Sequence, residues 1–546
     1  MAIIVDGRPL VFEAPGPGSW RLDTVHVPRP WSRFHGEVFG DNVSIGSSES
    51  ARRYGALSGR GRFALVHGFA YGSLSPVDPA EFPARFAAAE ETFATRRWRA
   101  ELAQWEDDVK PATIHTQLAL QRVDAAILSP QAQLAHVAAC RDNLARMIQQ
   151  HHQFNMAATL PIGDLIAHLR AWSDQPLGAF LALVRGSAPE SAGAMPELAR
   201  LAAAIRAEPA AHTLLTGDTP HGDILAGLQA MPGKVGAAAT GYIELVGWRI
   251  LDGLEVGAPV GLEVPEVLVK GIRRAVESGA PAPGHATPEE IARIRDLIPA
   301  AHRDTFDVLL AEARHNSRLR DERGNYSDVW AAGICRRAIL AAGTRLAEAG
   351  RLNDATHLVE ADWAEMQALV IGKPGPGADE LAARRRFRDS HLATEAPPLL
   401  GDPPKPPTMP KDLPPAALRM FRAAMASGDA MFATATEPNE PRRLRGIGAS
   451  PGSFTGIARV ILSPAEFGRL QQGDILVTPT TTESFNIVLP LLGAIVTDTG
   501  GLLSHAAIVS RELGIPGVVG TRAASKQITD GARLRVDGLT GEVFLL

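Results

Sequence analysis

One histidine near the carboxyl end, His505, stands in a sequence that suits the transfer of an anionic group. It follows an apolar run (LLGAIV) and the pair Gly500 and Gly501, and it opens an apolar-periodic stretch (HAAIVSREL). This pattern predicts a strand, a glycine turn and a helix with Ser504 as its N-cap. Glycines allow close approach to a bound group, and the N–H groups of a helix's first turn favour an anion. Because the helix dipole disfavours imidazolium, we expect a neutral, nucleophilic His505 that carries a phosphoryl group.

Other polar residues around this turn are expected to assist. Thr497 and Thr499 stand at the end of the strand, where they would face the phosphoryl group. Arg511 does not share the helical face of His505, which predicts a structural pairing of this arginine with Glu512 or with another domain. The alternative interpretation is an ordinary strand, turn and helix with a surface histidine.

The stretch 497–520 (TDTGGLLSHAAIVSRELGIPGVVG) closely resembles the phosphohistidine swivelling domain of the phosphoenolpyruvate-utilising enzymes. That family includes phosphoenolpyruvate synthase, pyruvate phosphate dikinase, rifampicin phosphotransferase and phenylphosphate synthase. The resemblance extends over about 444–546, through RGIGASPGSFTGIARVI, GDILVTPTTTESF and RLRVDGLTGEVFLL. It implies a C-terminal α/β domain in which His505 is phosphorylated during turnover.

Composition excludes several classes of protein. The chain has 546 residues, of which 45% are hydrophobic, so we expect several domains with substantial cores. A net charge of −5 makes nucleic acid an unexpected partner. The two cysteines, Cys140 and Cys335, are far apart, which indicates neither a disulfide framework nor a zinc site. The first residues do not form a signal peptide and no apolar run would span a bilayer, so we expect a cytoplasmic protein without membrane contact.

The chain divides into four predicted parts, which together make a multidomain α+β protein with a mostly helical central domain. Residues 1–80 are rich in Gly, Pro and short apolar runs, typical of a cap of strands and turns. Residues 81–396 have helical periodicity and form the expected acceptor-binding domain. Residues 397–443 contain a proline-rich linker and a connecting helix, which suit a mobile tether, and 444–546 form the swivelling domain.

Two domains of the full-length relatives are not expected in this sequence. These relatives pair the swivelling histidine with an ATP-grasp domain, and the dikinases add a phosphoenolpyruvate barrel. Only about 80 residues precede the helical region, no G-x-x-x-x-G-K-[ST] sequence occurs, and the swivelling domain is the last segment. We therefore expect a separate ATP-grasp subunit, as in phenylphosphate synthase, which binds most of the ATP and Mg²⁺. The resemblance implies that the β-phosphoryl group of ATP reaches His505.

A polar segment of the helical region supplies candidates for the acceptor site. Arg318 and Arg323 could neutralise phosphoryl oxygens, and Asp321 or Tyr326 could orient the acceptor hydroxyl. The alternative is a solvated helix end held by pairs such as Arg318 with Glu322.

A second candidate is the pair His151 and His152, which could include a general base or could simply interact with a helix C-terminus. A third is the segment 247–253 (GWRILDG). There the resemblance implies a glycine-rich acceptor loop, but the histidine of that loop is absent here.

The predicted function is phosphoryl transfer from His505 to the hydroxyl of a small phenol- or alcohol-type acceptor. Phosphorylation followed by loss of phosphate, which would dehydrate an alcohol, is equally compatible with the sequence. A phosphocarrier linked to phosphoenolpyruvate and a non-catalytic scaffold are the alternatives. The complete motif GGLLSHAAIVSRELGIP argues against the scaffold.

Overall fold

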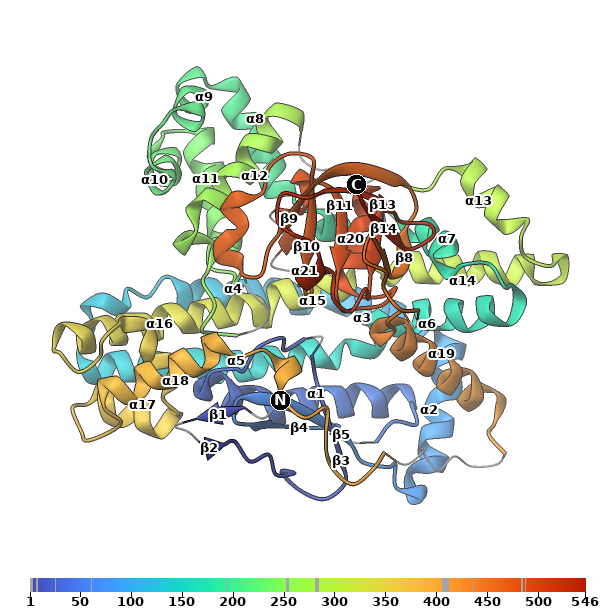
Figure 1. Ribbon diagram of the computed structural model, residues 1–546, viewed down its shortest axis with the longest axis horizontal. Helices are drawn as coiled ribbons and strands as arrows, with labels where there is room; N and C mark the ends of the chain where they lie inside the picture. Colours follow the sequence, from blue (N-terminus) through green and yellow to red (C-terminus); the bar gives the residue numbers. More distant parts are fainter. Residues whose placement is uncertain are drawn as a thin grey trace. The chain divides into compact units, whose positions relative to one another are not determined.

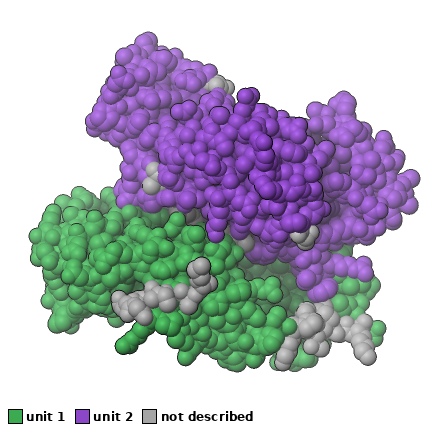
Figure 2. Space-filling model, viewed as in Figure 1, with its two compact units in different colours: residues 1–156, 253–258, 323–420 green, residues 157–252, 259–322, 421–546 purple. Residues whose placement is uncertain are grey.

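The computed structural model describes most of the chain, with short gaps. The described residues are 3–5, 8–24, 26–59, 61–193, 195–251, 255–279, 284–404, 412–435, 437–482, 485–486 and 488–546. They form two compact units, coloured separately in Figure 2. Unit 1 comprises residues 1–156, 253–258 and 323–420, and unit 2 comprises residues 157–252, 259–322 and 421–546.

Unit 1 is mainly helical. Its helices are α1 (Arg33–Tyr54), α2 (Phe82–Thr95), α3 (Arg97–Gln104), α4 (Lys110–Gln121), α5 (Pro130–Gln153), α16 (Asp328–Glu348), α17 (Trp363–Val370) and α18 (Ala378–Ser390). The long helices α1 and α16 both pack on α5. A small antiparallel sheet in the order β4-β5-β3-β6 joins residues from both ends of the unit, namely Gly61–Val66, Phe69–Leu74, Ser19–Leu22 and Leu399–Gly401. A further pair, β1 (Ile4–Val5) and β2 (Arg8–Pro9), is antiparallel.

The prediction of strands and turns throughout residues 1–80 is wrong for α1. Ser32 caps this helix through its side chain, which accepts a hydrogen bond from the His35 N–H, and Gly55 ends it in the left-handed conformation (φ 77°). Several glycines and serines lie within the helix, and its packing on α5 overrides their weak helix propensity. The division of the chain into four domains remains a prediction.

Unit 2 contains a helical part and a large sheet. Its helices include α6 (Asn155–Trp172), α7 (Leu177–Leu181), α8 (Pro196–Ala207), α9 (Pro209–Thr216), α10 (His221–Ala230), α11 (Lys234–Val246), α12 (Pro265–Ser278), α13 (Pro288–Arg295) and α14 (Arg303–Asn316). Helices α8–α12, drawn mostly in green in Figure 1, share one core that includes Leu201, Leu228 and Ile272. Helices α15 (Leu319–Tyr326) and α19 (Pro415–Phe432) contribute residues to both units.

The C-terminal sheet of unit 2 has the strand order β7-β14-β13-β9-β10-β11-β12-β8. The strands are β7 (Arg443–Arg445), β8 (Ile447–Ser450), β9 (Ser453–Val460), β10 (Asp474–Thr478), β11 (Leu492–Thr497), β12 (Gly517–Val519), β13 (Arg533–Asp537) and β14 (Glu542–Leu545). The four central strands β9 to β12 are parallel, and the outer strands pair antiparallel. Helix α20 (His505–Leu513) packs on β8, β11 and β12, and α21 (Ala524–Gln527) lies near β10 and β11. The predicted fold class, a mostly helical protein with a C-terminal α/β domain, is confirmed.

The predicted connecting helix is confirmed as α19, whereas residues 405–411 of the proline-rich segment lie outside the described residues. Within the described part of the chain, no helix is both long and apolar enough to cross a membrane.

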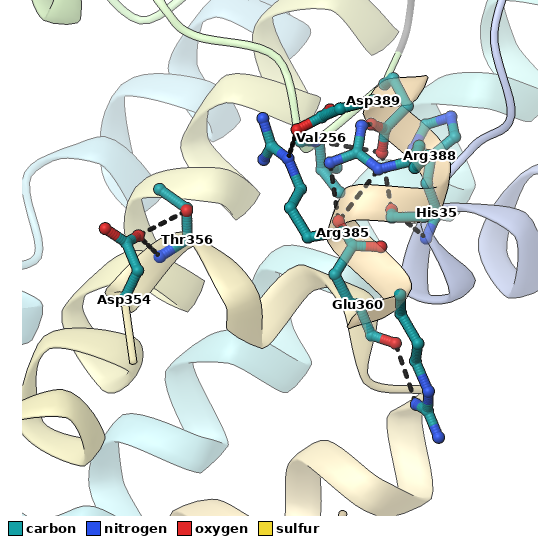
Figure 3. A network of polar contacts seen from close by, with 12 residues as sticks. His35, Val256, Asp354, Thr356, Glu360, Arg385, Arg388 and Asp389 are labelled. Carbon is teal, nitrogen blue, oxygen red and sulfur yellow. Dashed lines mark hydrogen bonds and ion pairs between the residues drawn. The ribbon is translucent and has the colours of Figure 1, made fainter. Parts of the chain in front are cut away.

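A buried ionic network stabilises unit 1 (Figure 3). Arg388 on α18 binds Glu255 through Nη1 (2.7 Å) and Glu360 through Nη2 and Nε (2.7 and 2.9 Å). Glu255 also accepts hydrogen bonds from the Ser32 hydroxyl (2.6 Å) and the Gly257 N–H (3.0 Å). The network thus connects the short segment 255–258 to the start of α1 and to α18, which are distant in sequence.

Candidate functional site

His505 lies where the sequence places it, at the first position of α20. The helix ends at Gly514, which is left-handed (φ 65°), and its N-cap is Ser504 in extended conformation. The Ser504 side chain makes no capping bond, and its buried Oγ has no hydrogen-bond partner among the described residues. A buried hydroxyl beside the first turn of α20 is therefore available to a bound group.

The His505 ring is only 5% exposed and is held from both sides. The Thr481 hydroxyl donates to Nδ1 (2.9 Å), and Nε2–H donates to the Asn486 Oδ1 atom (2.7 Å). Thr481 and Asn486 follow β10, which is parallel to β11, so both strands end at the same edge of the sheet. In a neutral imidazole, these contacts favour the tautomer with Nε2 protonated and Nδ1 unprotonated, and an unprotonated ring nitrogen is the form that attacks phosphorus.

A carboxylate from the helical part of unit 2 also lies near His505. The Asp321 Oδ2 atom is 3.9 Å from the His505 Nε2 atom, and the Asp321 side chain is 1% exposed. Neither Asp321 oxygen has a hydrogen-bond partner among the described residues, although Arg320 Nε lies 3.9 Å from Oδ1. Burial of a carboxylate without hydrogen bonds costs free energy, so a bound group that donates a hydrogen bond to Asp321 would be stabilised.

The two glycines before His505 serve different purposes. Gly500 has a positive φ (97°), which side-chain-bearing residues rarely adopt. Gly501 donates its N–H to Met431 O (2.9 Å), and a Cβ at Gly501 would lie 2.2 Å from Ala430 O. The close approach of this loop to the end of α19 therefore requires a glycine at position 501. The Gly501 N–H donates to Met431 O, so it is not available to a bound group.

Thr497 and Thr499 make hydrogen bonds within the loops at the sheet edge. The Thr497 hydroxyl donates to Thr499 O (2.8 Å), and the Thr499 hydroxyl donates to Pro479 O (3.0 Å). Their hydroxyl protons thus stabilise the loop conformation, and the role at the phosphoryl group stays a prediction.

Arg511 and Glu512 are buried on α20. Arg511 Nη1 donates to Ala449 O (3.1 Å), and burial lowers its pKa to about 10, with the charge of Glu512 acting in the opposite direction. Burial raises the pKa of Glu512 to about 7, although Glu512 accepts hydrogen bonds from the N–H groups of Gly186 (2.8 Å) and Ala188 (3.3 Å). These contacts support a structural role for both residues.

The candidates in unit 1 form one buried cluster. Arg323 Nη1 donates to the His151 carbonyl oxygen (3.0 Å) and to Asn155 Oδ1. His151 Nδ1 contacts both carboxylate oxygens of Asp328 (2.9 and 2.8 Å), and burial raises the pKa of Asp328 to about 7. The structure thus brings together Arg323 and His151, two candidates that are far apart in sequence. It also places Asp328 in this cluster, a residue that the sequence analysis did not select.

His152 is less suited to proton transfer than His151. Its Nδ1 atom contacts Ile148 O (2.8 Å), as expected near a helix C-terminus, and burial lowers its pKa to about 3. It stacks on the His151 ring with centroids 4.6 Å apart.

The remaining candidates lie in and beside α15. Arg318 Nε is 4.0 Å from Glu322 Oε1, the pairing that the alternative interpretation expected. Glu322 and Tyr326 are nevertheless buried, so α15 is not a solvated helix end. The Tyr326 ring lies under the ammonium group of Lys110, 4.3 Å from the ring centroid. Residues 252 and 253 of the third candidate segment lie outside the described residues.

Comparison with known proteins shows that two segments of the chain match two families. Residues 470–541, which include His505, Thr481 and Asn486, match the family described as PEP-utilising enzyme, mobile domain. This segment of the chain is thus similar to the mobile domain of that family. Residues 150–321 match the rifampicin phosphotransferase fourth domain, a range that includes His151, His152 and Asp321. The predicted resemblance to phosphoenolpyruvate-utilising enzymes and rifampicin phosphotransferase is confirmed.

The similar proteins are longer than this chain. An uncharacterized phosphotransferase of Bacillus subtilis is 27% identical over 312 residues, which are 56% of this chain and 36% of that protein. Rifampicin phosphotransferase of Streptomyces sviceus is 29% identical over 340 residues, 59% of this chain and 36% of that protein. A probable phosphoenolpyruvate synthase of Archaeoglobus fulgidus is 50% identical over 101 residues, 18% of this chain and 13% of that protein. The matched segments therefore cover about a third or less of each relative.

Sequence reasoning did not assign roles to Thr481 and Asn486 in the mobile domain. The signal was a polar run (TTTESFN) between two buried apolar segments. If those segments are parallel neighbours, the loops that follow them meet at one edge of the sheet. The parallel pairing of β10 and β11 was not evident from the sequence alone.

Proposed function

We propose that this chain is a phosphotransferase component in which His505 accepts a phosphoryl group and passes it to a hydroxyl of a small phenol- or alcohol-type acceptor. One observation carries the proposal. Within the mobile domain, a buried histidine begins a helix and has both ring nitrogens hydrogen-bonded, to Thr481 and Asn486. Such contacts hold a nucleophile in one tautomer and orientation, which favours covalent catalysis.

The reaction proceeds in two steps that share the histidine. In the first, the unprotonated ring nitrogen of His505 forms a bond to phosphorus while the bond from phosphorus to the leaving oxygen of the donor breaks. In the second, the acceptor oxygen bonds to phosphorus, the N–P bond breaks, and the hydroxyl proton passes to a base. Asp321, with its carboxylate 3.9 Å from His505 Nε2, remains a candidate for orienting the acceptor hydroxyl. Arg318 and Arg323 remain candidates for charge neutralisation, and Tyr326, His151 and His152 remain candidates for the acceptor site.

The donor in this proposal is ATP with Mg²⁺, held mainly by a separate ATP-grasp subunit. The relatives extend well beyond the matched segments, which cover 36% of rifampicin phosphotransferase of Streptomyces sviceus. This partial coverage supports a donor site outside the matched residues.

Mass spectrometry of the intact protein tests phosphorylation. The wild type, His505→Ala and His221→Ala are incubated with Mg-ATP, with and without the candidate nucleotide-binding subunit. His221 is a matched control because it also begins a helix, α10. We expect an acid-labile gain of one phosphoryl group in the wild type and in His221→Ala, only with the partner subunit, and none in His505→Ala.

Other outcomes decide between the alternatives. Phosphorylation without the partner contradicts the separate donor subunit. Loading by phosphoenolpyruvate instead of ATP favours the phosphocarrier. No gain with either donor contradicts the phosphotransferase and leaves the scaffold. Once loading is established, release of free phosphate together with a dehydrated acceptor distinguishes elimination from simple phosphorylation.

A further inference from the structure

The face of α20 that carries His505 also carries a buried carboxylate, Glu512. Glu512 follows His505 by seven residues, so the two side chains share one face of the helix, about 10 Å apart along its axis. Its Oε2 atom accepts a hydrogen bond from the Gly186 N–H (2.8 Å), and its Oε1 atom accepts one from the Ala188 N–H (3.3 Å). The turn Pro189–Ala192, which follows these residues, packs on α20. One carboxylate thus binds two backbone groups of the helical part of unit 2.

Apolar side chains support the same contact between α20 and the helical part of unit 2. Leu503, Ala506 and Val509 share a hydrophobic core with Ile166 of α6 and Leu181 of α7. A cavity between α20, α6 and α15 has a volume of 20 Å³, room for about one water molecule. The face that carries His505 and Glu512 is therefore packed closely on these helices.

The contact between His505 and Asp321 depends on this packing. Asp321 belongs to α15, and its Oδ2 atom lies 3.9 Å from His505 Nε2, which is too far for a hydrogen bond. Asn486 Nδ2 donates to Glu190 O, but at the long distance of 3.5 Å. Glu512, in contrast, accepts two hydrogen bonds, the shorter of 2.8 Å. Among these polar contacts, the two made by Glu512 are therefore best able to orient the face.

We propose that Glu512 is a positioning residue. By accepting the N–H groups of Gly186 and Ala188, it docks the shared face of α20 on the helical part of unit 2 and so holds His505 beside Asp321. Docking itself is independent of the proposed function, whereas its contribution to phosphoryl transfer rests on the proposed function.

The groups around Glu512 make this docking sensitive to pH. Burial raises the pKa of Glu512 to about 7, with the Asp321 carboxylate acting in the same direction and the two N–H groups and Arg511 in the opposite one. Strands β8, β11 and β12, on which α20 also packs, carry no ionisable residue. The other ionisable side chains near the contact are Arg185, Glu190, His285 and Arg320.

The direction of the pH dependence follows from the two pKa values of Glu512. When α20 is not docked, water restores the ordinary pKa of 4.5. The docked carboxyl group binds its proton more tightly, so docking is strongest below pH 4.5 and weakens as the pH rises through 7. Between pH 6 and pH 8 the equilibrium constant for docking should fall about tenfold. Glu512→Gln has no ionisable proton and removes this dependence.

Amide hydrogen exchange on the full chain measures docking directly. Protection of the Gly186 and Ala188 amides, corrected for the intrinsic exchange rate at each pH, reports how often the contact opens. We expect protection to fall about tenfold from pH 6 to pH 8 in the wild type and by less than about twofold in Glu512→Gln. In Glu512→Ala, protection at pH 6 should be at least about tenfold lower than in the wild type, because both hydrogen bonds are lost.

Amides of β10 and β11 separate docking from folding of the C-terminal α/β domain. These strands lie inside the sheet, so we expect their protection to be the same in all variants. Glu395→Ala is the matched control and should leave Gly186 unchanged. Glu395 also accepts a backbone N–H, from Leu392 (3.0 Å), but within unit 1.

Three results of this exchange experiment would overturn the proposal. The first is unchanged protection of Gly186 in Glu512→Ala. The second is a pH dependence in Glu512→Gln equal to that of the wild type. The third is a parallel loss of protection in β10 and β11, which would assign Glu512 to folding of the C-terminal α/β domain instead.

The reaction of His505 with diethyl pyrocarbonate, which modifies neutral imidazoles, tests whether docking holds this ring. Peptide mass spectrometry at one fixed pH gives the rate for His505, which is buried in the docked protein. We expect the rate to rise at least about tenfold in Glu512→Ala, in proportion to opening, and to stay unchanged in Glu395→Ala. Equal rates in Glu512→Ala and the wild type overturn the positioning role.

Phosphorylation of His505 is measured separately, so the two proposals can fail independently. Neither hydrogen exchange nor diethyl pyrocarbonate requires a phosphoryl donor. Docking that depends on Glu512, without phosphorylation of His505 by any donor, supports the positioning role and contradicts the phosphotransferase. Phosphorylation of His505, with docking unchanged in Glu512→Ala, does the reverse.

Discussion

The contacts of His505 determine which ring nitrogen is unprotonated, and this choice controls whether the ring can act as a nucleophile. Thr481 and Asn486 make these contacts from the loop after β10, and Asp321 lies beside them in a buried position. A neutral imidazole between a donor and an acceptor keeps one tautomer without carrying charge. The geometry therefore suits repeated loading and unloading of one side chain.

Removing the oxygen that orients His505 should slow its phosphorylation. In Asn486→Leu, the Nε2–H group loses its acceptor, and we expect the rate of phosphohistidine formation to fall by about tenfold, as loss of one oriented hydrogen bond implies. Thr481→Val should have an effect of similar size. Quenched-flow mass spectrometry measures the rate. Thr480→Val, one residue before Thr481, is the control, and an unchanged rate in Asn486→Leu contradicts an orienting role.

His35 should make the stability of unit 1 dependent on pH. It is fully buried, neither ring nitrogen has a hydrogen-bond partner among the described residues, and burial lowers its pKa to about 4. Below pH 6.5 the unfolded chain binds a proton that the folded chain does not, so stability present above pH 6.5 is lost as the pH falls towards 4. By pH 5 the loss is about 2 kcal/mol.

The variant His35→Phe tests this dependence. We expect the melting temperature to fall less between pH 7.5 and 5 in His35→Phe than in the wild type, as measured by differential scanning calorimetry. The same loss in both proteins would show that His35 does not contribute to acid sensitivity.

At the scale of elements, α19 and the loop before α20 are joined by a contact that permits no side chain. Gly501 and Leu503 donate their N–H groups to Met431 O and Ala430 O, at the end of α19. We expect Gly501→Ala to destabilise the protein by about 1–3 kcal/mol, because its Cβ would lie 2.2 Å from Ala430 O. Thermal unfolding measures this. Gly241→Ala in α11, where nothing lies within 4 Å of the added Cβ, should be neutral or stabilising.

The ionic network of Arg388 should matter more than the surface pairs on the same helix. In Arg388→Met, the buried carboxylates Glu255 and Glu360 lose their shared partner, and we expect a loss of about 3 kcal/mol. Arg385→Met is the matched control because Arg385 pairs with the exposed Asp389, a contact worth about 0.5 kcal/mol or less. Chemical denaturation compares the two variants. Equal losses would contradict the assigned importance of burial.

At the scale of the whole molecule, each unit is assembled from three separate segments of chain. In unit 1, α5 packs on α16, and β3 pairs with β6 from beyond residue 396. Stability in unit 1 therefore depends on contacts that are distant in sequence, which are made late and at high entropic cost.

This assembly predicts that residues 1–156 cannot fold alone. Without α16 and β6, the apolar faces of α5 and β3 lack their partners, so we expect no cooperative thermal transition in circular dichroism. Co-expression with residues 323–420 should restore a cooperative transition. Cooperative unfolding of the isolated fragment would contradict this dependence.

The sequence by itself determined the local features around His505. The strand, the glycine turn, the helix bounds and the N-cap follow from short-range periodicity and backbone preferences, and the motif identifies the mobile domain. Helix α19 was predicted for the same reason. In contrast, Gly501 was assigned to a bound group, because the sequence does not show that α19 ends against it.

Only the tertiary structure decided which distant residues meet. Parallel pairing of β10 with β11 brings Thr481 and Asn486 to the imidazole, and packing within unit 2 brings Asp321 there. Packing in unit 1 brings His151 into contact with Asp328. It also stabilises a helix over residues 33–54, many of whose side chains are buried. Local preferences are worth tenths of a kcal/mol per residue, whereas burial of an amphipathic face is worth several, so long-range packing prevails where the two disagree.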